Sequence, residues 1–149
     1  MRTPLARFAL LAIIPVMLGL AKAATTTVWE GQVRAKALCN FDGTTCWEGQ
    51  VRAKALCNIR GNTVWQGQVQ AKALFNVSGD VAWEGQTRAR ALFNLRGNQA
   101  WEGQVQAKAL ANFGGNVLWR GQVRASAIAN ASAELSPMER AVVLYLFAR

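Results

Sequence analysis

The sequence predicts an all-β fold, a β-solenoid of six 18-residue tandem repeats with a short capping α-helix at the C-terminus. The main observation is the segment WEGQVRAKALCN at residues 29–40, which recurs letter for letter at residues 47–58. Looser copies begin at Trp65, Trp83, Trp101 and Trp119, with no insertion between them. A fixed period this short indicates a repeat architecture in which each unit packs on its neighbours.

Alternation within each unit predicts β-strands. Trp29, Gly31 and Val33 share one parity, while the polar residues between them share the other. A period of two is typical of a strand. Each unit ends at an Asn-x-x-Gly corner, as at residues 40–43, because Asn and Gly tolerate the left-handed backbone that a corner needs. We therefore expect a strand of about eight to ten residues per unit, a bend near the repeated leucine, a short second segment and a glycine turn.

An α-helical repeat is the alternative, because 18 residues also make five turns at about 3.6 residues per turn. Two features favour strands over helices. Each unit carries two glycines, which leave a segment too short for an independently stable helix. The strand pattern also places all the charged side chains of a unit on one face.

Three segments divide the chain: a signal peptide at residues 1–23, the six-repeat solenoid at 24–133 and the capping helix at 134–149. The first has basic residues at Arg2 and Arg7, an apolar run over residues 8–20 and Ala-Lys-Ala at its end. This pattern predicts a secreted or cell-envelope protein in the periplasm, on the cell surface or outside the cell. A transmembrane anchor is the alternative, but the run is short for a membrane span.

In a solenoid, identical positions of successive coils stack about 4.8 Å apart. The six tryptophans are therefore predicted to form a core ladder: Trp29, Trp47, Trp65, Trp83, Trp101 and Trp119. The glycine two residues after each tryptophan would leave room for the indole ring. The invariant Gln and Asn of each unit would hydrogen-bond up the stack. For Gln, an outward, solvated side chain is the alternative.

Three cysteines fall in the first two units, at Cys39, Cys46 and Cys57. Cys39 and Cys57 hold equivalent positions one coil apart, so a Cys39–Cys57 disulfide is one prediction for an exported protein. The alternative is that both are buried small apolar groups, because Phe75 and Phe93 occupy the same position later. The odd number leaves one thiol over.

The end of the chain predicts a helix from about residue 137 to 148. Ser136 and Glu139 have the spacing of a capping box, with Pro137 at the first helical position. The helix is apolar on most sides, so we expect it to fold over the last coil. Contact with a partner or with a membrane surface, through this helix alone, is the alternative.

Residues 79–86, GDVAWEGQ, preceded by AKALF at 71–75, resemble the MORN repeat. That resemblance implies β-structure, although the family's hairpin turn is about five residues longer, so we expect no antiparallel hairpin to close here. The V-x-A-x-A alternation is also similar to bactofilin β-helices, and the secreted Gln and Asn repeats are similar to curlin-type amyloids. These resemblances cover only the repeats.

Groups that perform chemistry are scarce. The chain has no histidine, which excludes the commonest acid–base group and metal ligand. Four of its six glutamates recur at one repeat position, where they balance basic residues. We therefore expect no enzyme, no cofactor, no metal site and no small-molecule substrate.

Positive charge is the remaining functional signal, with a net charge of +9 that falls to +6 without residues 1–23. The basic residues at two repeat positions form a predicted stripe: Arg34, Lys36, Arg52, Lys54, Lys72, Arg88, Arg90, Lys108 and Arg124. Such a stripe attracts anionic polymers, whether polysaccharide, lipopolysaccharide or nucleic acid, or anionic lipid. Solubilising charge without a partner is the alternative.

These features predict a non-enzymatic structural scaffold, secreted or in the envelope, that assembles into fibres through the open strand edge of its first coil. On this hypothesis the partner is the protein itself, and deletion of residues 136–149 would uncover a second edge and promote fibres. The second hypothesis is a binding module for anionic surface polymers. Ice binding and a precursor of cationic peptides are less favoured.

Overall fold

The structure is a computed structural model that describes residues 25–149, in which twelve β-strands and one α-helix follow one another along the chain. The signal peptide predicted at residues 1–23 lies outside the described residues. The strands are β1 (Thr26–Glu30), β2 (Ala37–Asp42), β3 (Thr45–Glu48), β4 (Ala55–Arg60), β5 (Thr63–Gln66), β6 (Ala73–Ser78), β7 (Val81–Glu84), β8 (Ala91–Arg96), β9 (Gln99–Glu102), β10 (Ala109–Gly114), β11 (Val117–Arg120) and β12 (Ala127–Ala131). The helix is α2 (Pro137–Phe147).

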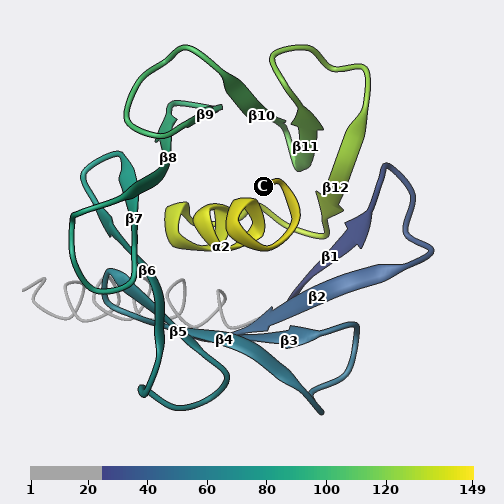
Figure 1. The fold of residues 1–149 in the computed structure, drawn as a ribbon. Helices are drawn as coiled ribbons and strands as arrows, with labels where there is room; N and C mark the ends of the chain where they lie inside the picture. Colours follow the sequence, from purple (N-terminus) through teal and green to yellow (C-terminus); the bar gives the residue numbers. More distant parts are fainter. Residues whose placement is uncertain (1–24) are drawn as a thin grey trace, which may run out of the picture.

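The twelve strands form a closed antiparallel barrel rather than an open stack. Each strand pairs with the strands before and after it, and β1 also pairs with β12 (Figure 1). The predicted β-solenoid is therefore wrong, although the fold is all-β with a C-terminal helix as expected. Each 18-residue unit contributes two neighbouring strands to the barrel, so the units are arranged around an axis instead of being stacked along one.

A tight two-residue turn joins the two strands of each hairpin at one end of the barrel. In the first turn, Asp42 pairs with Thr45, and Gly43 between them has φ of 64°. A glycine with positive φ at the first of two turn positions suits the twist of a β-hairpin. The expectation that no hairpin closes is thus wrong. The Asn-x-x-Gly corner was also misplaced, because Asn40 lies within β2 and only the glycine lies in the turn.

Wide six-residue loops join the strands at the other end of the barrel. They occupy residues 31–36, 49–54, 67–72, 85–90, 103–108 and 121–126. In the first, Gly31 has φ of 70°, and the amide of Glu30 donates to the Lys36 carbonyl at 2.8 Å. The strand of about eight to ten residues predicted from the alternation is therefore interrupted at Gly31. Val33, predicted to face the core, is 64% exposed.

The ring closes with the same contacts that join neighbouring units. In β2 and β3, Asn40 lies opposite Trp47, and in β12 and β1, Asn130 lies opposite Trp29. The Asn130 side-chain amide donates to the carbonyl oxygens of Gly31 at 2.8 Å and Val33 at 3.0 Å. Each of the other five units makes the equivalent pair of bonds, at 2.7–2.9 Å and 3.0–3.1 Å. The last unit thus joins the first without a separate interface.

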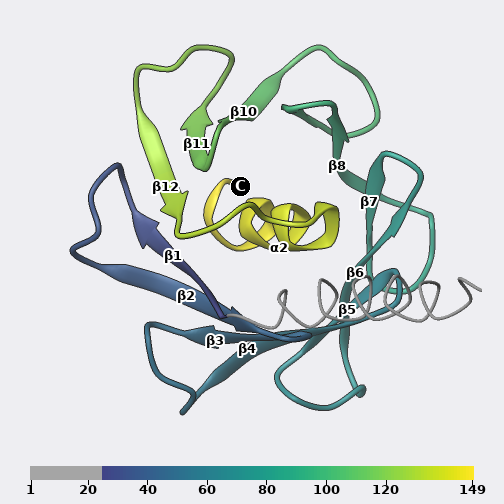
Figure 2. The same ribbon diagram turned by 180° about the vertical axis from the view of Figure 1, so that it is seen from behind.

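Helix α2 lies inside the barrel, as both views of the ribbon show (Figures 1 and 2). Strand β12 ends at the tight-turn end, and the chain enters the lumen from there. Twelve strands about 4.8 Å apart and tilted by about 40° give a backbone radius of roughly 12 Å. The helix is seen from its side within the ring in both views, so it runs across the lumen, and its eleven residues span about 16 Å, which fits inside the barrel.

The core consists of three wall positions per unit and the buried face of α2. The wall positions are Val28, Cys46, Val64, Ala82, Ala100 and Leu118 in the odd-numbered strands, with Cys39, Cys57, Phe75, Phe93, Ala111 and Ala129, and Phe41, Ile59, Val77, Leu95, Phe113 and Ala131, in the even-numbered strands. The helix contributes Ala141, Val142, Val143 and Leu144. Tyr145 also stacks on Phe75, with ring centroids 4.8 Å apart.

The C-terminal helix begins as predicted, with Ser136 as its N-cap. The Ser136 hydroxyl accepts from the Glu139 amide at 3.2 Å, and the Glu139 carboxylate accepts from the Ser136 amide at 2.9 Å. Its predicted position over the last coil is wrong, because it fills the lumen instead. Within residues 25–149, no helix is long and apolar enough to cross a membrane.

The Asn130 side chain is expected to stabilise ring closure. Asn130→Ala removes both hydrogen bonds to the first loop and leaves two carbonyls without their partner, so we expect it to lower the free energy of unfolding by about 2 kcal/mol. Urea unfolding followed by tryptophan fluorescence measures this. Asn116→Ala, at an exposed tight turn, is the control. Equal losses for the two variants would contradict a role in closure.

Leu144 tests whether α2 is an integral part of the core. This side chain is fully buried, so Leu144→Ala should lower the free energy of unfolding by roughly 2–5 kcal/mol through lost burial and a residual cavity. Leu146→Ala, at a half-buried position of the same helix, should cost less. If both variants unfold at the wild-type urea concentration, the helix does not support the barrel.

Candidate functional site

The six wide loops form the most distinctive surface of the molecule, and they project around the outside of the ring (Figure 1). We define the loop segments as each wide loop with the residue before it: residues 30–36, 48–54, 66–72, 84–90, 102–108 and 120–126. Their local fold follows from the sequence, because a glycine in the left-handed region turns the chain and the asparagine of the preceding unit binds two loop carbonyls. The loops are therefore fixed in six equivalent positions.

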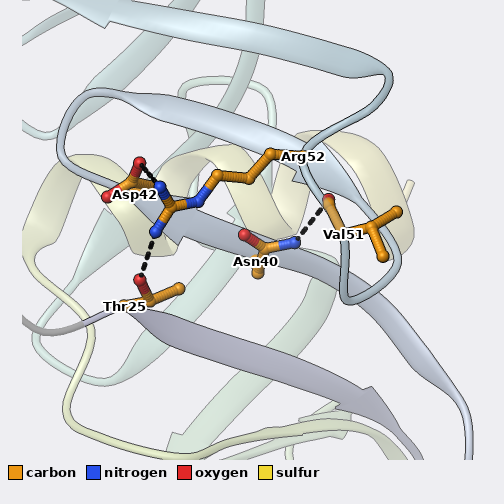
Figure 3. Close-up of polar contacts among 5 residues, drawn as sticks. All are labelled: Thr25, Asn40, Asp42, Val51 and Arg52. Carbon is orange, nitrogen blue, oxygen red and sulfur yellow. Dashed lines mark hydrogen bonds and ion pairs between the residues drawn. The ribbon is translucent and has the colours of Figure 1, made fainter.

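Figure 3 shows how the second loop lies across the outer face of β2. The Asn40 amide donates to the Val51 carbonyl at 3.1 Å. Beside it, the Arg52 guanidinium forms an ion pair with Asp42 at 2.9 Å and donates to the Thr25 hydroxyl at 3.1 Å. The Arg52 side chain thereby reaches the end of β2 nearest the tight turn. In the sixth unit Arg124 lies against Gly114, the residue equivalent to Asp42, so this loop leans over the wall in the same direction.

The loop segments carry all of the excess positive charge of the described chain. They contain ten basic and four acidic residues, whereas the rest of residues 25–149 contains four of each. All fourteen of these loop residues are exposed. The excess of six charges is therefore on the outer loops, and the remainder of the barrel is neutral.

Ion pairs within the loops neutralise only part of this charge. Four of the pairs join the first and last residues of a loop segment: Lys36–Glu30 at 3.1 Å, Lys54–Glu48 at 3.6 Å, Arg90–Glu84 at 3.3 Å and Lys108–Glu102 at 3.1 Å. Their side chains are more than half exposed, so each pair adds little stability. Across the described residues, five basic loop side chains form no ion pair: Arg34, Lys72, Arg88, Arg120 and Arg124.

The structure places all nine residues of the predicted stripe on the loop segments: Arg34, Lys36, Arg52, Lys54, Lys72, Arg88, Arg90, Lys108 and Arg124. They lie around a ring rather than in two rows up the face of a stack. The sequence reasoning missed Arg120, which stands where four other units have glutamate. An alignment of the six units would have identified Arg120, because the charge at this position is reversed in the last unit.

The tryptophans and glutamines do not form the predicted internal ladders. The tryptophans are half-buried and lie outside the core cluster, so a core ladder is wrong for Trp29, Trp47, Trp65, Trp83, Trp101 and Trp119. The residue before each tryptophan faces the lumen instead. The repeated glutamines are exposed, as in the alternative of a solvated side chain. The asparagines do form hydrogen bonds in every unit, but to loop carbonyls and not to one another.

The three cysteines form a buried cluster in the wall of the lumen and are present as free thiols. Cys46 lies opposite Cys57 across β3 and β4, and β3 also pairs with β2, which carries Cys39. Cys46 therefore lies between the two residues of the predicted Cys39–Cys57 pair. Hydrogen bonding with Cys39, together with burial, raises the pKa of the Cys46 thiol. Hydrogen bonding with Cys46, together with burial, raises the pKa of Cys57.

Comparison of the chain with protein-family models, with characterised proteins and with solved structures finds no significant match. Within the described part of the chain, no group of three or more His, Cys, Asp or Glu side chains is arranged to hold a metal ion.

The cysteine cluster predicts a loss of stability at alkaline pH. A thiol whose pKa is raised by folding favours the folded state below the unfolded pKa of about 8.5, and this contribution is lost as the pH rises above it. We expect the free energy of unfolding to fall by up to about 1.4 kcal/mol per thiol for each pH unit above that value. Urea unfolding at stepped pH values measures the slope.

Cys46→Val with Cys57→Ala is the matched control, because Val28 and Ala111 hold the equivalent positions in other units. This variant should have a flatter dependence on pH. The same slope in both proteins would show that the thiols do not cause the loss.

Proposed function

We propose that the protein is a binding module for anionic polymers and that the six loop segments are its binding surface. The observation that carries this proposal is the distribution of charge: the whole excess of six positive charges lies on exposed loops, and none lies on the rest of the barrel. Positive charge that served only solubility would have no reason to be confined to one class of loop. A surface of this kind attracts polyanions and accelerates their association.

The anchoring of the loops supports binding without a large entropic cost. Each loop is closed by a hydrogen bond between its ends and held by the asparagine of the preceding unit, as in the Asn40 contacts with Gly49 and Val51. The backbone that carries the loop arginines is thus ordered before a partner arrives. Because equivalent charges recur at equal angular intervals around the barrel, an extended polymer can contact several loops at once, and weak individual contacts then add up.

An exposed apolar side chain accompanies this charge in five of the six loops. These side chains are 62–64% exposed: Val33, Val51, Val69, Val105 and Val123. In each loop the valine directly precedes the residue at the arginine or glutamine position. A cation beside an apolar group suits polysaccharides and lipopolysaccharide, which combine anionic groups with apolar surface, better than it suits a uniformly polar polyanion.

The scaffold hypothesis loses its mechanism in the closed barrel. Growth by edge pairing needs a strand with free backbone groups, and each of the twelve described strands has a partner on both sides. Deletion of residues 136–149 would empty the lumen rather than uncover an edge, so fibres are no longer the expected result. We retain secretion or placement in the cell envelope as part of the proposal, based on the features of residues 1–23, since surface polymers are found there.

Neutralising unpaired loop arginines is expected to weaken binding to a polyanion. Arg34→Gln with Arg88→Gln introduces the residue found at the same position in units three and five, Gln70 and Gln106. We expect affinity for heparin, used as a sulfated probe, to fall by roughly tenfold at low salt, and the slope of log affinity against log salt to decrease by roughly 1.5. Fluorescence titration at several salt concentrations measures both.

Arg60→Ser with Arg96→Ser is the matched control. It removes the same charge from the ends of β4 and β8, next to the tight turns, and serine is native at the equivalent Ser78. Equal losses in the two double variants would mean that net charge alone governs binding. Binding that does not weaken with salt would contradict the proposal as a whole.

A further inference from the structure

A cavity of about 320 Å³ lies between the first turn of α2 and the wall formed by β6, β7 and β8. It opens at the tight-turn end of the barrel, next to Gly79 and Gly97, and its inner lining is apolar: Val77, Ala82, Phe93, Leu95, Leu135 and Met138. This volume is at the lower end of the range for small-molecule sites in proteins. The backbone of the wide loops lies at the opposite end of the strands, and their side chains lie on the outer face of the barrel.

Two features of the sequence create this space. In unit three, two wall positions hold small side chains. Val77 stands where β2 has Phe41, and Ala82 stands where β11 has Leu118. The Arg140 side chain of the helix is also held at the edge of the cavity by contacts with neighbouring strands. Arg140 donates to the Asn98 side-chain oxygen at 3.1 Å and lies 4.7 Å from the centre of the Phe113 ring. With Arg140 held there, the space beside Val77 and Ala82 is left unfilled.

The mouth of the cavity is acidic, in contrast to the basic loops. Asp80 and Glu134 both line it and both are exposed. Among the described residues neither carboxylate has a partner in an ion pair. Asp80 is the one acidic residue at its position in the tight turns, where the other units have Thr44, Asn62, Asn98 and Asn116. The only basic residue in the lining, Arg140, is already held by Asn98 and Phe113.

We propose that this cavity binds a small apolar amine, with its hydrocarbon part in the lumen and its ammonium group between Asp80 and Glu134. The lining excludes water from the hydrocarbon, and the two carboxylates select a cation over a neutral or anionic group of the same size. The site is independent of the polyanion surface, because it uses different residues, the lumen in place of the outer face, and the opposite sign of charge.

Hexylamine, hexanol and hexanoate are the probes that separate these contributions, because they share a chain and differ in the charge of the head group. Met138 lines the cavity and is the one methionine among residues 25–149, so its ¹³C-labelled methyl group reports occupancy by NMR. We expect hexylamine to shift this resonance saturably, hexanol to bind roughly fivefold more weakly and hexanoate more weakly still. Equal affinity for the three probes would overturn the selection for a cation.

Two substitutions test the cavity and the charge separately, and each introduces the residue that another unit has at the equivalent position. Ala82→Leu introduces leucine, as at the equivalent Leu118, and fills the cavity. Hexylamine should then no longer shift the Met138 methyl resonance. Asp80→Asn introduces the residue of Asn62 and should weaken hexylamine roughly threefold while leaving hexanol unchanged. Asn62→Asp, the control, adds a carboxylate at a turn outside this cavity and should change neither affinity.

Urea unfolding establishes that each variant is folded before binding is measured. Undiminished hexylamine binding by folded Ala82→Leu would place the ligand elsewhere and overturn the proposal. If Ala82→Leu does not fold, Ala82→Val, with the residue of Val64, replaces it and should weaken hexylamine binding; unchanged affinity would again overturn the proposal. Equal effects of Asp80→Asn on hexylamine and hexanol would contradict the contact with ammonium. Heparin affinity should be the same in all these variants.

Discussion

Everything in this structure depends on one contact that is made six times: an asparagine side chain on one unit binds the loop of the next. The bonds from Asn40 to the second loop and from Asn130 to the first are the same contact, although one joins neighbours in the sequence and the other joins the ends of the described chain. No unit is terminal in the ring. Repeat proteins that stack in a row need special capping units, and this barrel needs none because each unit has two equivalent neighbours.

The outside of the barrel is nearly symmetric, but the lumen is not. One helix fills a space surrounded by six units, so equivalent wall positions meet different parts of it and cannot all be the same size. Where the loops repeat, the wall varies: one position is Cys39 in the first unit, Phe75 in the third and Ala111 in the fifth. The buried thiols and the cavity beside Met138 both lie at these variable positions. The repeated exterior and the varied interior therefore suit different roles, multivalent contact outside and individual packing or binding inside.

Local signals in the sequence predicted the parts of the fold that depend on local chemistry. The 18-residue period, the turn glycines such as Gly43 and the capping box at Ser136 are all present in the structure. The alternation from Trp29 to Val33 gave a wrong prediction, because it continues past the end of β1 into the loop that begins at Gly31. The face with Trp29 and Val33 was therefore assigned to the core, whereas Val28 is the buried residue. Closure could not be predicted in this way, since the pairing of β1 with β12 joins residues a hundred positions apart and has no local signature. The loop cations were identified from the sequence, but their ring arrangement and the acidic cavity depend on that closure.

A closed ring also restricts how this chain can evolve. An open stack can gain or lose a unit at either end with little effect on the others, but a seventh unit here would add two strands and widen the barrel by roughly 2 Å in radius. One helix would no longer fill the lumen, and the wall residues that contact it would lose their partner. Five units would leave too little room for the helix. The copy number of the repeat is thus set by the size of the helix that fills the lumen, and duplication of single units, the process that produces such repeats, becomes deleterious once the ring has closed.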